Sequence, residues 1–236
     1  MTRIIMISDI HGCVAELNRL LIALDYSPGK DKLMLLGDYV DRGTNSKGAV
    51  DRVMELVRRH GAIALRGNHD QRLVDLARAS NAEVRHKFLE HGGIQTLRSY
   101  CGGKWAEMTD EALEQAVERI RTDYAHHLDF LASLPLYAED DRHIYVHAGL
   151  NPDYENWRDQ SDRDFMYIKD AFIQSRRTYG KVVVFGHTRT KDIHGSPDIW
   201  FGEGKIGIDG GCAYGMQLNA LVYRDGRYES EKVRAL

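Results

Sequence analysis

The sequence predicts an α/β fold built on a mostly parallel sheet. Three apolar runs, at residues 3–7, 33–36 and 62–65, each lead into a glycine-containing polar loop. Continuous apolar runs of this length indicate strands that are covered on both faces. Segments with helical periodicity follow these runs, and alternating strands and helices favour parallel pairing through right-handed crossovers.

The composition is that of an ordinary globular protein. The chain has 236 residues, of which 43% are hydrophobic and 28% are charged, and its formal net charge is −3. No basic field therefore favours nucleic acid or an anionic membrane, and no apolar run approaches the roughly 20 residues of a membrane span. Cys13, Cys101 and Cys212 are scattered and odd in number, which argues against a disulfide framework and favours a reducing cytoplasm.

Helices are expected after the first two strands. Apolar residues recur at helical spacing over residues 14–24 and again over residues 50–57. The first segment stops at residues 27–29, which include a proline and a glycine, and the second stops at Gly61.

Residues 71–140 differ in character, because they are polar and helical in pattern. Glycine pairs at 92–93 and 102–103 interrupt them, and the apolar positions between Leu113 and Leu131 predict one long amphipathic helix. We expect these helices to flank a cleft rather than to form a separate domain, so that residues 1–236 make one domain.

Further strands are expected in the second half of the chain. Apolar runs at residues 144–146 and 182–185 predict two strands, and residues 161–178 between them have a helical pattern. Residues 206–209 and 218–223 are predicted to form antiparallel strands around a glycine-rich turn.

Potential metal ligands follow five of the predicted strands, and each lies beside or close to a glycine. They are Asp9, His11, Asp38, Asn68, His147 and His187. Taken singly, each has an ordinary explanation as a helix N-cap, a turn residue or a loop histidine. Because parallel strands bring their carboxyl ends to one edge of a sheet, we expect these side chains to converge.

The chemistry of this set indicates two metal ions. Two carboxylates, three imidazoles and a carboxamide are too many ligands for one ion, and without a thiolate they suit borderline-hard divalent metals. Asp38 is the natural bridge between two ions about 3.5–4 Å apart. The residual positive charge of such a centre suits a phosphate group.

The residues around these ligands resemble a known family. The motifs are residues 9–12 (DIHG), 37–43 (GDYVDRG), 67–70 (GNHD), 146–149 (VHAG) and 186–187 (GH). They are similar to those of the phosphoprotein phosphatases, a branch of the calcineurin-like metallophosphoesterases, and most of all to small bacterial and phage members of the bacteriophage lambda phosphatase type. The resemblance implies a β-sandwich flanked by helices and a dimetal centre, often filled by manganese, with iron, zinc, nickel or cobalt as alternatives. It also implies direct in-line attack by a metal-bound hydroxide.

The resemblance further implies a role for each matching residue. One metal would be held by Asp9, His11 and Asp38, and the other by Asp38, Asn68, His147 and His187. His69 would be the general acid that protonates the leaving group, and Asp41 would orient its imidazole. Asp70 stands where the family more often has glutamate.

Phosphate binding is assigned to two cationic residues. Arg42 would clamp two phosphate oxygens, a task that suits its planar guanidinium. The family usually supplies a second arginine after the VHAG strand, and Lys169 aligns with that position. Arg163, Arg176 or Arg177 are the other residues that could take this role.

These observations predict a cytoplasmic, metal-dependent phosphoesterase. We expect phosphomonoester hydrolysis, with phosphoserine or phosphothreonine in proteins as the substrate. The alternative is symmetrical hydrolysis of dinucleoside polyphosphates such as diadenosine tetraphosphate, because a related branch uses the same ligands. A more remote alternative is a non-catalytic phosphopeptide-binding module. The expected partner is thus a phosphorylated protein or a small phosphoester, with no nucleic acid and no membrane.

Overall fold

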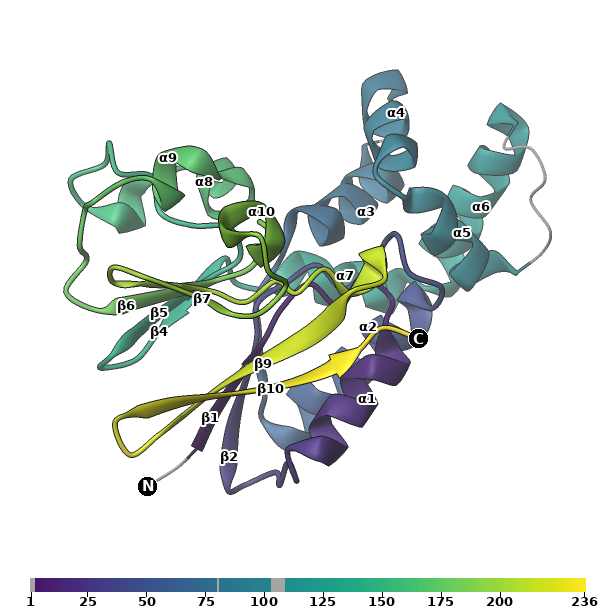
Figure 1. Cartoon of the computed structure of the whole chain (residues 1–236). Coiled ribbons are helices and arrows are strands. Elements are labelled where there is room, and N and C mark those ends of the chain that lie inside the picture. Colours follow the sequence, from purple (N-terminus) through teal and green to yellow (C-terminus); the bar gives the residue numbers. More distant parts are fainter. Residues whose placement is uncertain (1–2, 80, 103–108) are drawn as a thin grey trace.

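Two five-stranded mixed sheets pack face to face, and helices cover their outer faces (Figure 1). The computed structural model describes residues 3–79, 81–102 and 109–236. In spatial order, the first sheet contains β10 (Arg227–Arg234), β9 (Gln217–Arg224), β1 (Arg3–Ile7), β2 (Asp31–Leu35) and β3 (Ile63–Ala64). The second contains β4 (Tyr137–Glu139), β5 (His143–Val146), β6 (Val182–Phe185), β8 (Lys205–Gly207) and β7 (Trp200–Gly202).

The helices fall into three groups along the chain. Beside the first sheet lie α1 (Val14–Ala23) and α2 (Ser46–His60) (Figure 1). The middle of the chain forms α3 (Asn68–Arg78), α4 (Ala82–Glu90), α5 (Gly93–Cys101), α6 (Asp110–Asp123) and α7 (Ala125–Ser133). Beside the second sheet lie α8 (Asp162–Tyr167), α9 (Asp170–Ile173) and α10 (Thr190–His194), with the short 3₁₀ turn η1 (Trp157–Asp159). A second 3₁₀ turn, η2 (Cys212–Tyr214), contacts β9 of the first sheet. Within the described ranges, no helix combines the length and apolar character needed to cross a membrane.

The alternation of side chains along β1 divides the core into layers. Ile5 and Ile7 pack with residues of the helices that cover the first sheet. Met6, between them, packs instead with residues of the second sheet such as Val184 and Ile206. Successive residues of a strand point to opposite faces, so one apolar run supplies both the outer core and the contact between the sheets.

The structure confirms the α/β class and the parallel pairing of β1, β2 and β3. The predicted antiparallel pair at residues 206–209 and 218–223 is wrong. β8 pairs with β6 and β7 in the second sheet, whereas β9 pairs with β1 and β10 in the first. Because β9 is apolar and buried along most of its length, it suits a position between two neighbours better than an exposed hairpin.

Two predicted helices are interrupted. The helix expected over residues 113–131 bends at Tyr124, where φ is −124°, and α6 and α7 on either side both contact α3. The helix expected over residues 161–178 stops after Tyr167, because the Phe165 carbonyl accepts a hydrogen bond from the Ala148 backbone nitrogen at 2.9 Å. The break expected at residues 102–103 lies partly outside the described residues, which stop at Gly102.

Candidate metal and phosphate site

The loops that follow β1, β2, β3, β5 and β6 meet at one edge of the two sheets. They contain Asp9 and His11, then Asp38, Asp41 and Arg42, and finally His147 and His187, while the loop after β3 leads directly to Asn68 and His69 at the start of α3. The structure therefore brings together all six of the predicted metal ligands. Five of these six side chains are at most 3% exposed, and His187 is partly buried.

The backbone is strained where these loops meet. Asp9, His11, Asp38, Asp41, Arg42 and His187 all have positive φ angles, between 44° and 71°. Outside this site, the described residues include only two other non-glycine residues in that region, Asp25 and Asp225. Positive φ is costly for residues with a side chain and persists where the surrounding structure enforces it, which is typical of functional sites.

Two glycines allow the loops to approach each other closely. A Cβ atom at Gly67 would collide with the Asp38 carboxylate, and one at Gly186 would collide with Ser8 Oγ and the Asp9 carboxylate. Any larger residue at these positions would therefore push the acidic side chains out of place.

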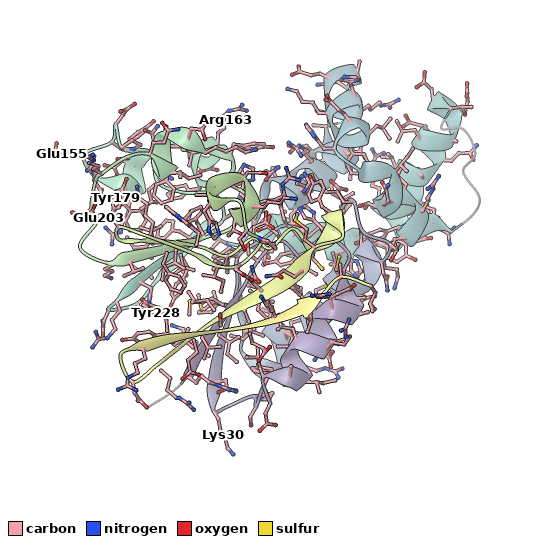
Figure 2. All side chains as sticks on the ribbon, in the orientation of Figure 1. Lys30, Glu155, Arg163, Tyr179, Glu203 and Tyr228 are labelled. Atoms are coloured by element: carbon pink, nitrogen blue, oxygen red, sulfur yellow. The ribbon has the colours of Figure 1, made fainter. Side chains whose placement is uncertain are left out.

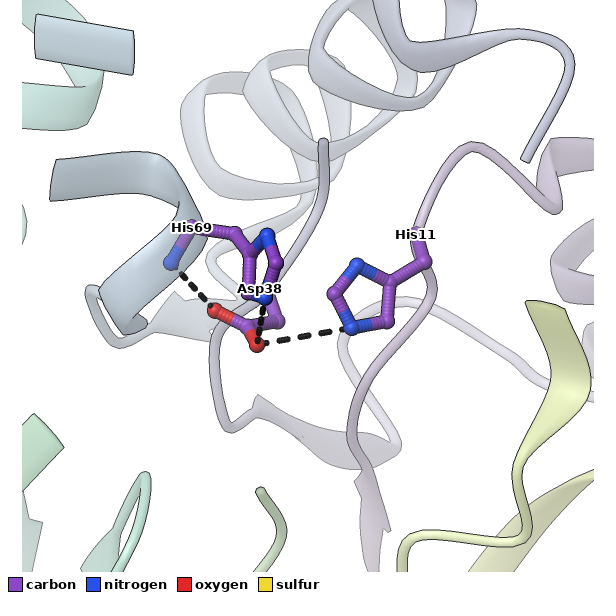
Figure 3. Close-up of side chains that lie close together, drawn as sticks. All are labelled: His11, Asp38 and His69. Atoms are coloured by element: carbon purple, nitrogen blue, oxygen red, sulfur yellow. Dashed lines mark hydrogen bonds and ion pairs between the residues drawn. The ribbon is translucent and has the colours of Figure 1, made fainter. Parts of the chain in front are cut away.

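Asp38 lies at the centre of the site (Figure 3). Its Oδ2 atom is 3.4 Å from His11 Nε2, 3.4 Å from His147 Nε2 and 4.0 Å from His69 Nε2. Its Oδ1 atom accepts a hydrogen bond from the His69 backbone nitrogen at 2.9 Å. Asp38 thus belongs to two groups of potential metal donors, one with His11 and His69 and the other with His147 and His187.

The histidine rings turn their Nε2 atoms towards Asp38. His11 Nδ1 donates to the Val40 carbonyl at 2.7 Å, and His147 Nδ1 donates to the Leu36 carbonyl at 2.8 Å. A backbone carbonyl can only accept, so Nδ1 carries the hydrogen and Nε2 faces the centre. His187 Nε2 is buried and has no hydrogen-bond partner.

A buried nitrogen without a partner and a thiolate-free set of imidazoles and carboxylates fit a divalent metal site. Asp9 lies on the side of the cluster that contains His11. Its Oδ2 accepts from Ser8 Oγ and from the His187 backbone nitrogen, whereas its Oδ1 lies 3.9 Å from His11 Nε2.

The proton affinities in this cluster are strongly perturbed. Burial raises the pKa of Asp9 to about 6 and that of Asp41 to about 7. Burial disfavours charge on His147, but the Asp38 carboxylate outweighs this effect and raises the pKa of His147 to about 9. Clusters of shifted pKa values are characteristic of catalytic and metal-binding sites. A cation bound at His147 Nε2 would replace this proton.

His69 and Asp41 form a close pair beside the metal-ligand cluster. His69 Nδ1 is 2.7 Å from Asp41 Oδ2, and the other Asp41 oxygen accepts from Thr96 Oγ1 at 2.6 Å. His69 Nε2 accepts from Arg72 Nη1 at 3.1 Å. The Asp41 carboxylate fixes the ring with Nε2 directed away from it, and burial holds the pKa of His69 well below its ordinary value, so the ring is neutral in this state. The role of His69 as the acid stays a prediction.

Asp70 has a structural function that the sequence did not reveal. Its buried carboxylate accepts hydrogen bonds from the backbone nitrogens of Asp38, Tyr39 and Gly67, each at 2.9 Å. It therefore holds the loop after β2 against the start of α3.

A polar cavity of about 440 Å³ opens over the cluster. Among the predicted residues, it is lined by Asp38, Arg42, Asn68, His69, Lys169 and His187. It is also lined by residues that the sequence did not single out, which include Arg72, His91, Tyr167, Arg189 and Tyr214. Arg72 lies three residues after His69 on α3, a spacing that could have pointed to it. The other four come from separate elements and had no such signal.

Arginines stack on two tyrosines at the walls of this cavity. The guanidinium groups of Arg42 and Arg189 lie 5.1 and 4.4 Å from the ring centre of Tyr214. Arg72 and Arg163 lie 5.5 and 5.0 Å from the ring centre of Tyr167. Such contacts hold a guanidinium plane in a defined orientation.

The residues considered for the second phosphate contact lie in different places. Lys169 lines the cavity, whereas Arg163, Arg176 and Arg177 are not among its lining residues. Arg163 lies on the exposed side of α8 (Figure 2). Arg177 instead donates to the carbonyl oxygens at residues 152 and 155. The role of second phosphate ligand therefore stays with Lys169 as a prediction.

Comparison with known proteins agrees with the predicted family and disagrees with the predicted protein-phosphatase activity. The family description "Calcineurin-like phosphoesterase" matches residues 2–204. A relative from Anoxybacillus flavithermus, named bis(5'-nucleosyl)-tetraphosphatase PrpE [asymmetrical], is 30% identical over 92% of this chain and 89% of its own length. The protein of that name from a Geobacillus species is 31% identical over 94% and 90% of the two chains.

Solved structures agree with this placement. A crystal structure provisionally described as a diadenosine tetraphosphatase matches all of this chain and 94% of its own, with a TM-score of 0.65 and 25% identity. A serine/threonine phosphatase from Saccharomyces cerevisiae also matches the whole chain and 80% of its own, with a TM-score of 0.55. Its identity of 14% shows a shared fold alone.

The predicted phosphoserine or phosphothreonine phosphatase activity is therefore wrong, because the curated relatives are named as tetraphosphatases. The comparisons also do not single out the lambda phosphatase type. The buried histidine and aspartate groups match a family whose members use a dimetal centre. From the match to residues 2–204 and the site described above, the chain belongs to the calcineurin-like phosphoesterase family.

Proposed function

We propose that this protein is a metal-dependent hydrolase of dinucleoside polyphosphates, with diadenosine tetraphosphate as the representative substrate. The observation that carries this proposal is the lining of the cavity. Four cationic side chains, those of Arg42, Arg72, Lys169 and Arg189, line the opening above the buried cluster. The carboxylates of Asp170, Asp192 and Asp209 line it as well, and Asp192 forms an ion pair with Arg189. A phosphomonoester offers a single phosphate to these cations, whereas a tetraphosphate chain offers four in a row.

The names of the relatives support asymmetrical cleavage, which yields a nucleoside monophosphate and a nucleoside triphosphate. The sequence alone had suggested symmetrical cleavage as the alternative. In both cases the bond that breaks is a phosphoanhydride, so the two modes differ in which phosphorus is placed over the cluster.

The two groups of potential donors around Asp38 support an assignment of the metal ligands. We assign Asp9, His11 and Asp38 to one divalent cation and Asp38, Asn68, His147 and His187 to the other. When bound, such cations polarise phosphoryl oxygens and lower the pKa of water. The carbonyl bonds of His11 and His147 fix their rings in advance, so that both Nε2 atoms are presented to the ions.

We assign Arg42 to the binding and orientation of the phosphoryl group. Its Nη1 atom donates to His11 Nε2 at 2.5 Å, and its guanidinium is backed by the Tyr214 ring. The group thus lies at the border between the metal-ligand cluster and the cavity. When a cation takes His11 Nε2, this donor becomes free for a phosphate oxygen.

His69 supplies the proton in this proposal, with Asp41 holding its ring. The leaving group of a phosphoanhydride is a nucleotide phosphate, which is much less basic than an alkoxide. Proton donation should therefore contribute less to hydrolysis of diadenosine tetraphosphate than to hydrolysis of an alkyl phosphate.

Lys169 would bind the phosphoryl group that reacts, together with Arg42, and the other two cations would bind the phosphates that do not react. Arg72 and Arg189 line the cavity, and their guanidiniums are oriented by the rings of Tyr167 and Tyr214. Preorganised donors of this kind stabilise a polyphosphate chain at little cost in side-chain entropy.

Product analysis tests the proposal. The protein, loaded with Mn²⁺, is incubated with diadenosine tetraphosphate, and nucleotides are separated by ion-exchange chromatography. Equal amounts of AMP and ATP are the expected result, and chelation should abolish them. ADP as the sole product would reject asymmetrical cleavage, and release of phosphate from phosphopeptides without hydrolysis of the dinucleotide would reject the proposed substrate class.

A further inference from the structure

Two of the three cysteines lie together beside the site. The Sγ atoms of Cys13 and Cys212 and a carboxylate oxygen of Glu16 are all within 4.8 Å of one another. Cys13 immediately precedes α1, and Cys212 begins η2, so the pair brings together two segments that are far apart in the sequence. The third cysteine, Cys101, ends α5 and hydrogen-bonds to the carbonyl of residue 116.

A second cavity gives access to this pair. It has a volume of about 340 Å³ and is lined by Cys13, Glu16 and Cys212, and also by Arg42 and Gly43. Cys212 is only 2% exposed, whereas Cys13 is partly exposed. A small solute can therefore reach Cys13 first, with Cys212 lying behind it.

We infer that Cys13 and Cys212 are a redox-sensitive dithiol that a peroxide converts into a disulfide. The Cys13 sulfur attacks one peroxide oxygen, the O–O bond breaks, and Cys13 becomes a sulfenic acid while the first water leaves. The Cys212 sulfur then attacks the Cys13 sulfur, and the hydroxyl leaves as the second water with the proton of the Cys212 thiol. Two thiols are oxidised and one peroxide is reduced, so the step balances.

Glu16 is placed to assist this reaction. Its carboxylate is buried, lies beside both sulfurs and accepts a hydrogen bond from the Leu236 backbone nitrogen at 2.9 Å. In the described part of the chain, no cation forms an ion pair with it. It can therefore take a thiol proton during the exchange. The contact with Cys13 and burial both raise the pKa of the Cys212 thiol, so we expect the second step to be slow.

The disulfide would couple to the catalytic loops. Cys13 Sγ hydrogen-bonds to the carbonyl of His11 at 3.8 Å. On the other side, η2 carries Tyr214, the ring on which Arg42 stacks. Closing the sulfurs to about 2.05 Å draws these two segments together. We expect the oxidised protein to hydrolyse phosphoesters more slowly, whichever phosphoester is its natural substrate.

Thiol counting and mass spectrometry test the pair without reference to activity. After treatment with hydrogen peroxide, the protein should retain one of its three thiols and lose about 2 Da, with a cross-linked peptide containing residues 13 and 212. The matched control Cys101→Ser should lose the same mass. Cys13→Ser, Cys212→Ser and Cys212→Ala should form no such disulfide.

Activity supplies the second readout. Hydrolysis of p-nitrophenyl phosphate should fall at least 3-fold on oxidation and recover with dithiothreitol in the parent and in Cys101→Ser. Each of the other variants is compared with its own untreated sample, where we expect no reversible loss. A sulfinic acid on Cys13 without a disulfide would overturn the proposal. So would a stoichiometric sulfur-to-Co²⁺ absorption band that both Cys13→Ser and Cys212→Ser abolish, since the cluster would then be a metal site.

Discussion

Removing the ammonium group of Lys169 should weaken catalysis on every phosphoester. Lys169 lies between α8 and α9, lines the cavity and is exposed. Within the described residues, its side chain has no hydrogen bond or ion pair to another group, so its charge is available to a phosphate. Hydrogen bonds between charged groups contribute about 1.5–3 kcal/mol when buried, and exposure reduces this value.

We therefore expect Lys169→Met to cost about 1–2 kcal/mol of transition-state stabilisation, which is roughly a 5- to 30-fold loss in kcat/KM. The loss should be similar for diadenosine tetraphosphate and p-nitrophenyl phosphate, because the residue is assigned to the phosphoryl group that reacts. Lys169→Arg should retain or exceed the parent activity, since a guanidinium can bind two oxygens.

The matched control for this variant is Lys191→Met. Lys191 is exposed on α10 and does not line the cavity. Lys191→Met therefore removes one positive charge, as Lys169→Met does, but removes no contact with a phosphate in the cavity. Steady-state kinetics at two ionic strengths separates a direct contact from the general field. Unchanged kcat/KM on both substrates, or equal losses in Lys169→Met and Lys191→Met, would refute the assignment.

Four further outcomes follow from the site and the fold. Asp38→Asn should lose both metal ions, because Asp38 belongs to both donor groups, and metal content after dialysis measures this. His69→Asn should keep its metal but hydrolyse phenyl phosphate about 10²–10⁴-fold more slowly, with a smaller loss on p-nitrophenyl phosphate and on diadenosine tetraphosphate. Arg189→Met should lower kcat/KM about 5-fold for diadenosine tetraphosphate but leave p-nitrophenyl phosphate unaffected, because it is assigned to a phosphate that does not react. Burial lowers the pKa of His127 to about 4, below its ordinary value of about 6.5. The unfolded state thus binds more protons in this window, so the free energy of unfolding should decrease as pH falls through it, and more steeply than in His127→Gln.

Each of these expectations has a contrary result. Full metal content in Asp38→Asn would remove its bridging role, and equal losses of His69→Asn on all three substrates would remove the acid role. A matching loss on p-nitrophenyl phosphate would place Arg189 at the reacting phosphate. Parallel pH profiles in urea denaturation would show that His127 is not the source of the acid sensitivity.

The sequence was sufficient to predict part of the convergence of the metal ligands. Asp9 and Asp38 follow β1 and β2, which are parallel neighbours ending at one edge, so local patterns alone placed these two near one another. His147 follows β5 in the second sheet, and its approach to Asp38 depends on how the two sheets pack. The same argument could not pair β8 and β9. These strands are neighbours in the chain, and only the burial of β9 on both faces explains why they separate into different sheets.

The walls of the cavity were harder to predict for a related reason. Arg189, Tyr214 and His91 come from elements that are distant in sequence and meet through tertiary packing. An arginine or tyrosine in a loop carries no local signal of what it will face, whereas a ligand beside a glycine at a strand end does. The protein-phosphatase activity was mispredicted for a similar reason, because the motifs at the strand ends describe the metal-ligand cluster and say nothing of the walls that face the rest of a substrate.

The pairing of β9 with β1 has a consequence for how the protein is made. Ile4 to Ile7 near the amino terminus align with residues 220–223. The first strand to leave the ribosome therefore cannot pair with β9 until nearly the whole chain has been synthesised. The half-formed sheet exposes an apolar edge throughout translation, which invites aggregation or a chaperone. A ribosome-stalled chain that lacks residues after 216 should therefore remain sensitive to protease, although every metal ligand has already been synthesised.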